Sequence, residues 1–167
     1  ELEFEGLPNV AAVCAYPNMV SVVRENLAAA NVRIASVAGG FPSSMTFKEI
    51  KTEEARMAVI HGADEIDVVL PLWAFLEGNF QYCKDEITDI KNVIGDTRLK
   101  VILESGILAD PEKIWQASLV SLEAGADFIK TSTGKMPVSA TPEAAWVMCH
   151  ALKYWYQTTG SMKGFKA

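Results

Sequence analysis

Short apolar segments alternate with helical patterns along the whole chain, and this alternation restricts the fold more than any other feature. The apolar segments are of strand length, and three of them are closed by Pro or Gly, which is typical of buried strands. They lie at residues 10–16, 33–38, 65–70, 99–103, 127–131 and 164–167. Apolar residues at helical spacing occupy residues 18–30, 46–60, 71–77, 80–94, 110–124 and 141–159. Apolar strands that are each followed by a helix indicate a parallel sheet covered by helices.

Two fold classes have this alternation, the open doubly wound sheet and the (β/α) barrel. The repeat here is roughly 30 residues, and a barrel of eight such units needs about 250 residues. The 167 residues of the chain therefore supply only part of a barrel. No linker or shift in composition divides the sequence, so we expect one domain over residues 1–167.

Charge and hydrophobicity exclude several classes of function. The chain has 21 acidic and 15 basic side chains, a formal net charge of −6, and 50% hydrophobic residues. Disordered chains combine low hydrophobicity with high charge, so this chain is expected to fold. An acidic chain without a basic cluster is a poor candidate for nucleic-acid binding. No apolar run reaches the ~18 residues of a membrane span, so no membrane partner is expected.

The cysteines and the first residues bear on the compartment. Cys14, Cys83 and Cys149 are odd in number and lack the spacing of a metal site. Residues 1–5 lack the basic start of a signal peptide. We therefore expect a reducing, cytoplasmic location. Cys14, inside the first strand, is expected to be a small buried hydrophobic residue.

Three helices carry start signals. Asp110 and Thr141 each precede a Pro, which is an N-cap residue followed by Pro at the first helical position. Thr46 with Glu49 matches the capping box. These signals predict helix starts at all three places.

An internal repeat relates two of the strands. Residues 62–67, Gly-Ala-Asp-Glu-Ile-Asp, match residues 125–130, Gly-Ala-Asp-Phe-Ile-Lys. The alignment puts Asp67 and Lys130 at the same place in two strands that have one strand between them. Alternate strands of a barrel fill the same interior layer, so both side chains should point inward at similar depth. An open sheet would weaken this prediction.

Charged side chains within buried strands need a partner or a function. Desolvation or a second cation can turn a lysine such as Lys130 into a nucleophile. The alternative is a lysine at a strand end whose ammonium group reaches solvent. Asp67 is either a proton relay beside an amine or a structural carboxylate that pairs with a neighbouring lysine such as Lys100.

The segment after the fifth strand, Thr131-Ser132-Thr133-Gly134-Lys135, has hydroxyls, a Gly and a Lys that suit an anion such as phosphate. It is not a Walker A loop, because Met136 follows the lysine. As a bare motif it is weak, and a plain polar loop is the interpretation that the residues alone favour. No set of His, Cys and carboxylate residues has the spacing of a metal site.

Four blocks of the sequence, in order and spacing, resemble the deoxyribose-phosphate aldolase family. They are residues 12–17 (Ala-Val-Cys-Ala-Tyr-Pro), 62–69 (Gly-Ala-Asp-Glu-Ile-Asp-Val-Val), 128–135 (Phe-Ile-Lys-Thr-Ser-Thr-Gly-Lys) and 164–167 (Gly-Phe-Lys-Ala). The resemblance covers nearly the whole chain. It implies a (β/α)₈ TIM barrel, of which this chain covers about strands 2 to 7. It also implies reversible cleavage of 2-deoxy-D-ribose 5-phosphate to glyceraldehyde 3-phosphate and acetaldehyde, in deoxyribose phosphate catabolism.

The resemblance also implies roles for individual residues. Lys130 matches the lysine that forms the Schiff base with the substrate carbonyl. Lys166 matches the second lysine, which in the family activates the first and joins the proton relay. Asp67 matches the acid/base carboxylate of that relay. The family needs no metal or other cofactor, and its substrate partner is a small phosphosugar.

Further positions match the lining of the family's pocket. Lys100 matches another lysine near the site, and Cys14 matches a cysteine of the pocket without an essential role. Thr133, Gly134 and Lys135 fall in the phosphate-binding segment after the sixth barrel strand. Barrel enzymes often form dimers, so a homodimer is the assembly that we consider.

The chain departs from the family pattern at both ends. Strand 1, the end of strand 7 and strand 8 with its phosphate-binding loop have no counterpart in the 167 residues. We expect a longer polypeptide to supply them, and the 167 residues alone are expected to be a poor aldolase. Unpaired sheet edges at both ends would favour association.

Two other functions compete with this interpretation. One is a different lysine-dependent barrel aldolase or transaldolase, against which the set of Asp67, Lys130 and Lys166 argues. The other is a truncated or degenerate barrel that serves as a non-catalytic binding scaffold. The presence of all three expected catalytic side chains argues against inactivation by substitution.

Overall fold

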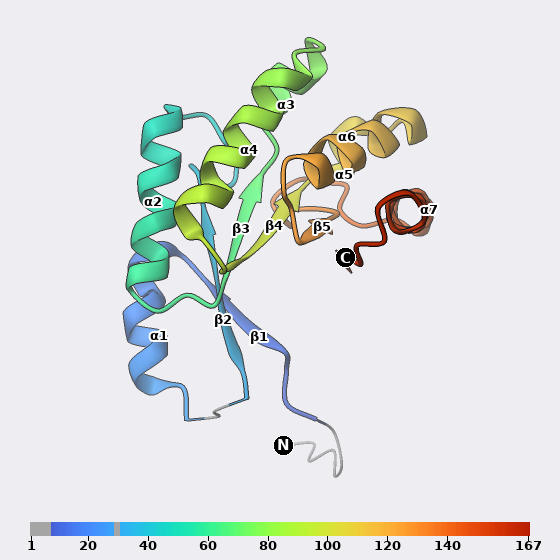
Figure 1. The fold of residues 1–167 in the computed structure, drawn as a ribbon. Coiled ribbons are helices and arrows are strands. Elements are labelled where there is room, and N and C mark those ends of the chain that lie inside the picture. Colours follow the sequence, from blue (N-terminus) through green and yellow to red (C-terminus); the bar gives the residue numbers. More distant parts are fainter. Residues whose placement is uncertain (1–7, 29–30) are drawn as a thin grey trace.

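Six parallel strands form one curved sheet, in which the strands lie in sequence order. The computed structural model describes residues 8–28 and 31–167. The strands are β1 (Ala12–Ala15), β2 (Arg33–Ala38), β3 (Glu65–Val69), β4 (Arg98–Ile102), β5 (Phe128–Lys130) and β6 (Gly164–Lys166). All six strands were predicted from the sequence. The sheet curls as in a barrel that is open on one side, so the α/β partial-barrel class is confirmed (Figure 1).

Helices connect the strands and cover the outer, convex face of the sheet (Figure 1). They are η1 (Pro17–Met19), α1 (Val20–Asn26), α2 (Lys48–Ile60), α3 (Leu72–Leu76), α4 (Phe80–Ile94), α5 (Ser105–Leu108), α6 (Pro111–Glu123) and α7 (Pro142–Thr159). The short helix α5 was not predicted. The helix predicted over 18–30 ends at Asn26, and residues 29–30 lie outside the described residues.

Two of the three predicted caps are present. The Asp110 side chain accepts a hydrogen bond from the Glu112 N–H, and the Thr141 hydroxyl accepts one from the Ala144 N–H. The capping box at Thr46 is wrong, because α2 begins at Lys48 after an extended N-cap, Phe47, whose side chain makes no capping bond.

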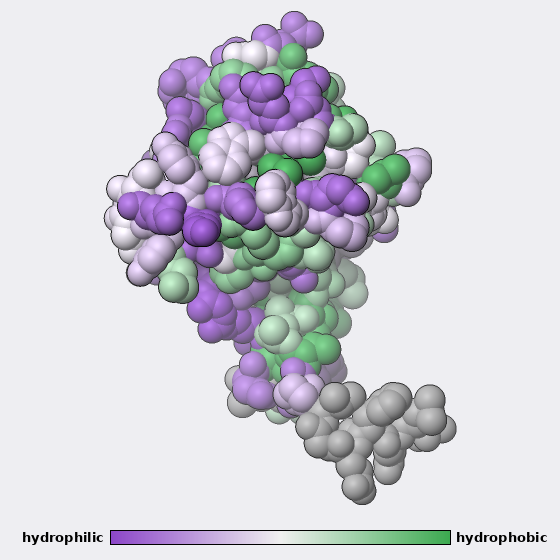
Figure 2. All heavy atoms as spheres, turned by 90° about the vertical axis from the view of Figure 1, so that its right-hand side faces the viewer, coloured by the Kyte–Doolittle hydropathy of each residue, from purple (hydrophilic) through white to green (hydrophobic). Residues whose placement is uncertain are grey.

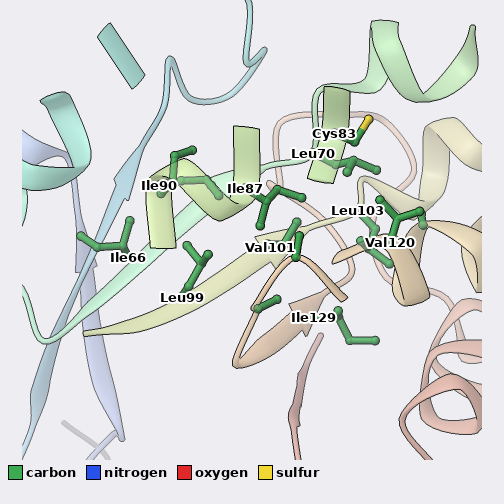
Figure 3. Packing of buried hydrophobic residues seen from close by; sticks show 14 of the residues in the cluster. Ile66, Leu70, Cys83, Ile87, Ile90, Leu99, Val101, Leu103, Val120 and Ile129 are labelled. Atoms are coloured by element: carbon green, nitrogen blue, oxygen red, sulfur yellow. The ribbon is translucent and has the colours of Figure 1, made fainter. Parts of the chain in front are cut away.

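Apolar side chains on the convex face form the core between the sheet and the helices. Ile66, Leu99 and Ile129 come from three adjacent strands and are 0% exposed. They belong to the same buried cluster as Ile87 and Ile90 of α4, as Figure 3 shows. In β2 to β5 every second residue points into this core, and the residues between them face the concave side.

The two copies of the internal repeat make the same contact between strands. The Asp64 carboxylate accepts the Ile34 N–H at 2.8 Å, and the Asp127 carboxylate accepts the Leu99 N–H at 3.0 Å. Each carboxylate therefore fastens its own strand to the start of the preceding strand.

In both copies the aspartate also pairs with a basic side chain of a helix. Arg24 of α1 binds Asp64 at 2.7 Å, and Lys91 of α4 binds Asp127 at 2.8 Å. The glycines of the repeat, Gly62 and Gly125, lie against these two basic side chains. The repeat thus joins one strand to the preceding strand and to the helix that comes before that preceding strand.

The concave face is open between β1 and β6, the two edge strands. Figure 2 looks at the molecule from the side of the C-terminal helix and shows hydrophobic residues at the surface between hydrophilic ones. Cys14 is exposed on β1. The expectation of a buried hydrophobic Cys14 is therefore wrong, because no further strand covers its face among the described residues.

Candidate active site

A carboxylate and two lysines from three adjacent strands meet on the concave face. The Asp67 side chain on β3 is 1% exposed. Its Oδ2 accepts a hydrogen bond from Lys130 Nζ of β5 at 2.8 Å, and its Oδ1 accepts one from Lys100 Nζ of β4 at 2.7 Å. Asp67 thus pairs with both lysines that the sequence offered, and Lys130 is buried rather than solvated at a strand end.

Strand tilt explains how Asp67 reaches Lys130. In the hydrogen-bonded ladder Asp67 pairs with Lys100, and Lys100 pairs with Phe128, so Lys130 lies two residues further along its strand. Strands in a barrel are tilted, with a stagger of about one residue per strand at constant depth. A two-residue offset across two strands therefore brings both side chains to the same depth.

Lys166 lies beside this cluster at the open edge. It pairs with Lys130 in the ladder between β5 and β6, and its residue is exposed. On the same strand Gly164 has no side chain at the place where the Phe128 ring lies, so β6 packs closely on β5.

Cys14 faces the charged cluster from β1. Partial burial of the thiol, with the negative charge of Asp67, raises the pKa of Cys14. The positive charges of Lys130, Lys100 and Lys166 act in the opposite direction without outweighing them.

The charged side chains surround a hollow of about 670 Å³ on the concave face. Cys14, Asp67, Lys100 and Lys166 are among the residues that line it. Lys130 does not line the hollow and is connected to it through Asp67.

The segment after β5 is clamped by Glu104, a buried residue just before α5. Glu104 has a left-handed φ of 51°, and its carboxylate accepts the Thr133 hydroxyl at 2.5 Å and the Thr133 N–H at 3.2 Å. The Lys135 N–H donates to the Thr133 hydroxyl oxygen at 3.1 Å. Gly134 has a φ of 77°, which only glycine adopts freely. Within residues 8–28 and 31–167 no hydrogen bond joins residues 133–135 directly to Asp67.

The chain matches the family model described as "DeoC/LacD family aldolase" over residues 3–158. It belongs to the DeoC/LacD aldolase family. Among named relatives of this family, a "Putative deoxyribose-phosphate aldolase" from Caenorhabditis elegans is 43% identical over 157 residues, covering 93% of this chain and 52% of the relative. A "Deoxyribose-phosphate aldolase" from Mus musculus is 44% identical over 158 residues, covering 93% of this chain and 50% of the relative.

A solved structure has the same fold as this DeoC/LacD family chain. The crystal structure of a putative deoxyribose-phosphate aldolase from Coccidioides immitis superposes with a TM-score of 0.81 and 27% identity, covering 94% of this chain and 69% of that one. The chain spans about half the length of the curated relatives that it matches.

Sequence reasoning missed two acidic residues of this DeoC/LacD family site. Glu65 is two residues before Asp67 on β3, so the two-residue period of a strand could have placed it on the same face. Glu104 has no such signal, because its contact with Thr133 depends on a left-handed backbone and on a loop far along the chain.

Across residues 8–28 and 31–167, no three His, Cys, Asp or Glu side chains gather closely enough to hold a metal ion. In the same ranges no helix has both the length and the apolar character that crossing a bilayer requires.

Proposed function

We propose that this protein cleaves 2-deoxy-D-ribose 5-phosphate reversibly to glyceraldehyde 3-phosphate and acetaldehyde through a Schiff base on Lys130. The observation that carries the proposal is the 2.8 Å contact between Lys130 Nζ and Asp67 Oδ2 on the concave face. It occurs in a chain whose named relatives are deoxyribose-phosphate aldolases.

The contact gives the amine a direct route for its proton. Lys130 Nζ passes a proton to Asp67 and attacks the C1 carbonyl of the open-chain sugar. Loss of water leaves a protonated imine. Removal of the proton from the C3 hydroxyl then breaks the bond between C2 and C3, and the electron pair moves into the imine. Glyceraldehyde 3-phosphate leaves, and the remaining enamine is protonated at carbon and hydrolysed to acetaldehyde and the free lysine.

Lys166 and the segment 133–135 have supporting roles in this proposal. Lys166 pairs with Lys130 in the ladder between β5 and β6 and lines the hollow. These positions support its proposed role as an added positive charge that exchanges protons. Thr133, Gly134 and Lys135 offer a hydroxyl, backbone N–H groups and an ammonium group for the phosphate. The place of the reaction in deoxyribose phosphate catabolism, the cytoplasmic location and the homodimer stay predictions.

Reductive trapping tests the imine. The protein is incubated with deoxyribose 5-phosphate and sodium borohydride, and the adduct is located by peptide mass spectrometry. We expect an adduct on Lys130 that disappears in Lys130→Met and persists in Lys91→Met, whose lysine lies on the outer face. An adduct on another lysine would overturn the role of Lys130. No adduct from a sample with native circular dichroism would favour the binding scaffold.

A second experiment tests the phosphate segment. Glu104→Gln removes the charge that clamps Thr133, so the segment 133–135 should lose its fixed geometry. We expect a higher KM for deoxyribose 5-phosphate and little change for unphosphorylated deoxyribose. An equal loss with both sugars would show that Glu104 supports the fold rather than phosphate binding.

A further inference from the structure

Glu65 lies at one end of a row of charged side chains on the concave face. Its residue is 6% exposed. Glu65 Oε1 accepts Arg33 at 3.2 Å and Arg98 at 3.3 Å, and its Oε2 pairs with Lys100 Nζ at 2.5 Å. The two arginines reach solvent, so they hold the carboxylate at the mouth of the hollow from two neighbouring strands.

Lys100 is the shared member of two ion pairs. Its Nζ contacts both Glu65 Oε2 and Asp67 Oδ1, and its residue is 5% exposed. Burial acts to lower the pKa of Lys100, but the charges and hydrogen bonds of Asp67 and Glu65 outweigh it and raise that pKa. Within residues 8–28 and 31–167, Lys130 contacts one carboxylate oxygen, Asp67 Oδ2.

We propose that Glu65 is a positioning residue that decides which lysine on Asp67 keeps its proton: it holds Lys100 as a fixed cation, so that Lys130 is the amine that becomes free. This inference rests on the proposed function. Lys100 then acts through Asp67, and its Nζ is engaged by two carboxylates. Its role differs from the substrate binding that the family resemblance implies.

The other charges around the hollow agree with this division of roles. The titratable and charged groups that face the two lysines are Cys14 on β1, Arg33 on β2, Glu65 and Asp67 on β3, Arg98 on β4 and Lys166 on β6. Cations outnumber carboxylates in this set, so the cluster favours the loss of one proton. Lys100 lies between two carboxylates, which hold it as a cation. Lys130 contacts one carboxylate among the described residues.

Competitive acetylation tests the inference on the full chain without substrate. Trace acetic anhydride is applied between pH 6 and pH 11, and the rates at Lys130 and Lys100 are measured by peptide mass spectrometry. In Glu65→Gln we expect the rate at Lys130 near pH 8 to fall about tenfold, equivalent to one pH unit in its midpoint. The rate at Lys100 should rise in the same sample.

Replacement of Lys100 gives the second measurement. Lys100→Met leaves Asp67 to Lys130 alone, and the rate at Lys130 should again fall about tenfold. Lys100→Arg keeps the cation and should restore the parental rate. Lys91→Met, which removes a lysine paired with Asp127 on the outer face, should leave both rates unchanged.

The directions in which the two acetylation rates change distinguish a positioning role of Glu65 from a merely structural one. If Glu65→Gln only loosens the fold, the rates at Lys130 and Lys100 rise together, and the inference is overturned. It is also overturned if neither rate changes. Borohydride trapping on the same samples tests the proposed function separately. The expected exchange of rates without an imine adduct would support the positioning role and refute the aldolase.

Discussion

Asp127 offers the sharpest test of how the sheet is held together. Its carboxylate accepts hydrogen bonds from the Leu99 N–H at 3.0 Å, from Lys91 Nζ at 2.8 Å and from Lys163 Nζ at 3.2 Å. These bonds tie β5 to β4, to α4 and to the segment before β6. Asp127→Asn keeps the shape of the side chain and removes its charge.

The magnitude follows from the exposure of the site. The Asp127 side chain is 29% exposed, so each lysine contributes about 0.5 kcal/mol, as partly solvated pairs do. The backbone N–H bond to a charged acceptor contributes about 2 kcal/mol, of which a neutral amide retains about half. We expect Asp127→Asn to lower the free energy of unfolding at pH 7 by about 2 kcal/mol. For a chain of this size that corresponds to about 4–8 °C in Tm.

The effect should also depend on pH. Burial acts to raise the pKa of Asp127, but hydrogen bonds from Lys91, from the Leu99 N–H and from Lys163 outweigh it and hold that pKa below its ordinary value. A depressed folded-state pKa gives stability that is fully present above about pH 4 and is lost as the pH falls through the folded value. The difference between Asp127→Asn and the parent should therefore shrink below about pH 4.

Urea unfolding at pH 7 and at pH 3 measures this difference. Asp96→Asn, at an exposed turn just before β4, makes the same charge change as a control and should alter stability little. Equal stability of Asp127→Asn and the parent at pH 7 would refute the reasoning. So would a difference that persists undiminished at pH 3.

Three other predictions concern the rest of the fold. Lys51→Met leaves the buried Glu86 without its partner at 2.7 Å and should cost about 3–5 kcal/mol in urea unfolding; a smaller loss would show that water reaches the pair. Gly106→Ala places a methyl group on the Val138 carbonyl oxygen and should cost about 1–3 kcal/mol; an unchanged Tm would contradict that contact. Burial raises the pKa of Cys83 to about 11, so iodoacetamide at pH 8 should modify it only in the unfolded chain, and modification of the folded chain would contradict this.

Strands β2 to β5 could be predicted because helices bury one face of each of them. Ile66, Leu99 and Ile129 are fully buried on the convex face, so strand segments stand out as apolar runs. The helix starts at Asp110 and Thr141 were also predictable, because the capping bond reaches only two or three residues along the chain.

The start of α2 could not be predicted in this way. The loop before it is held by residues inside the helix, since Glu54 accepts the Gly40 N–H at 2.9 Å and Lys51 Nζ donates to the Ser44 hydroxyl at 2.8 Å. Those contacts move the helix start to Lys48, beyond the Thr46 capping signal. A local motif predicts a helix start only where no contact from further along the chain competes with it.

The sequence repeat predicts part of the charged cluster, and the geometry of the sheet determines the rest. The matching segments around Asp67 and Lys130 give the correct face of each strand, because side chains alternate with a period of two. They do not give the two-residue stagger that separates these residues in the ladder. By ladder position Ile102, not Lys100, is the neighbour of Lys130, and an argument from pairing alone would have separated the acid from the amine. Strand tilt joins them, so the proposed chemistry depends on the curvature of the sheet as much as on the residues that it carries.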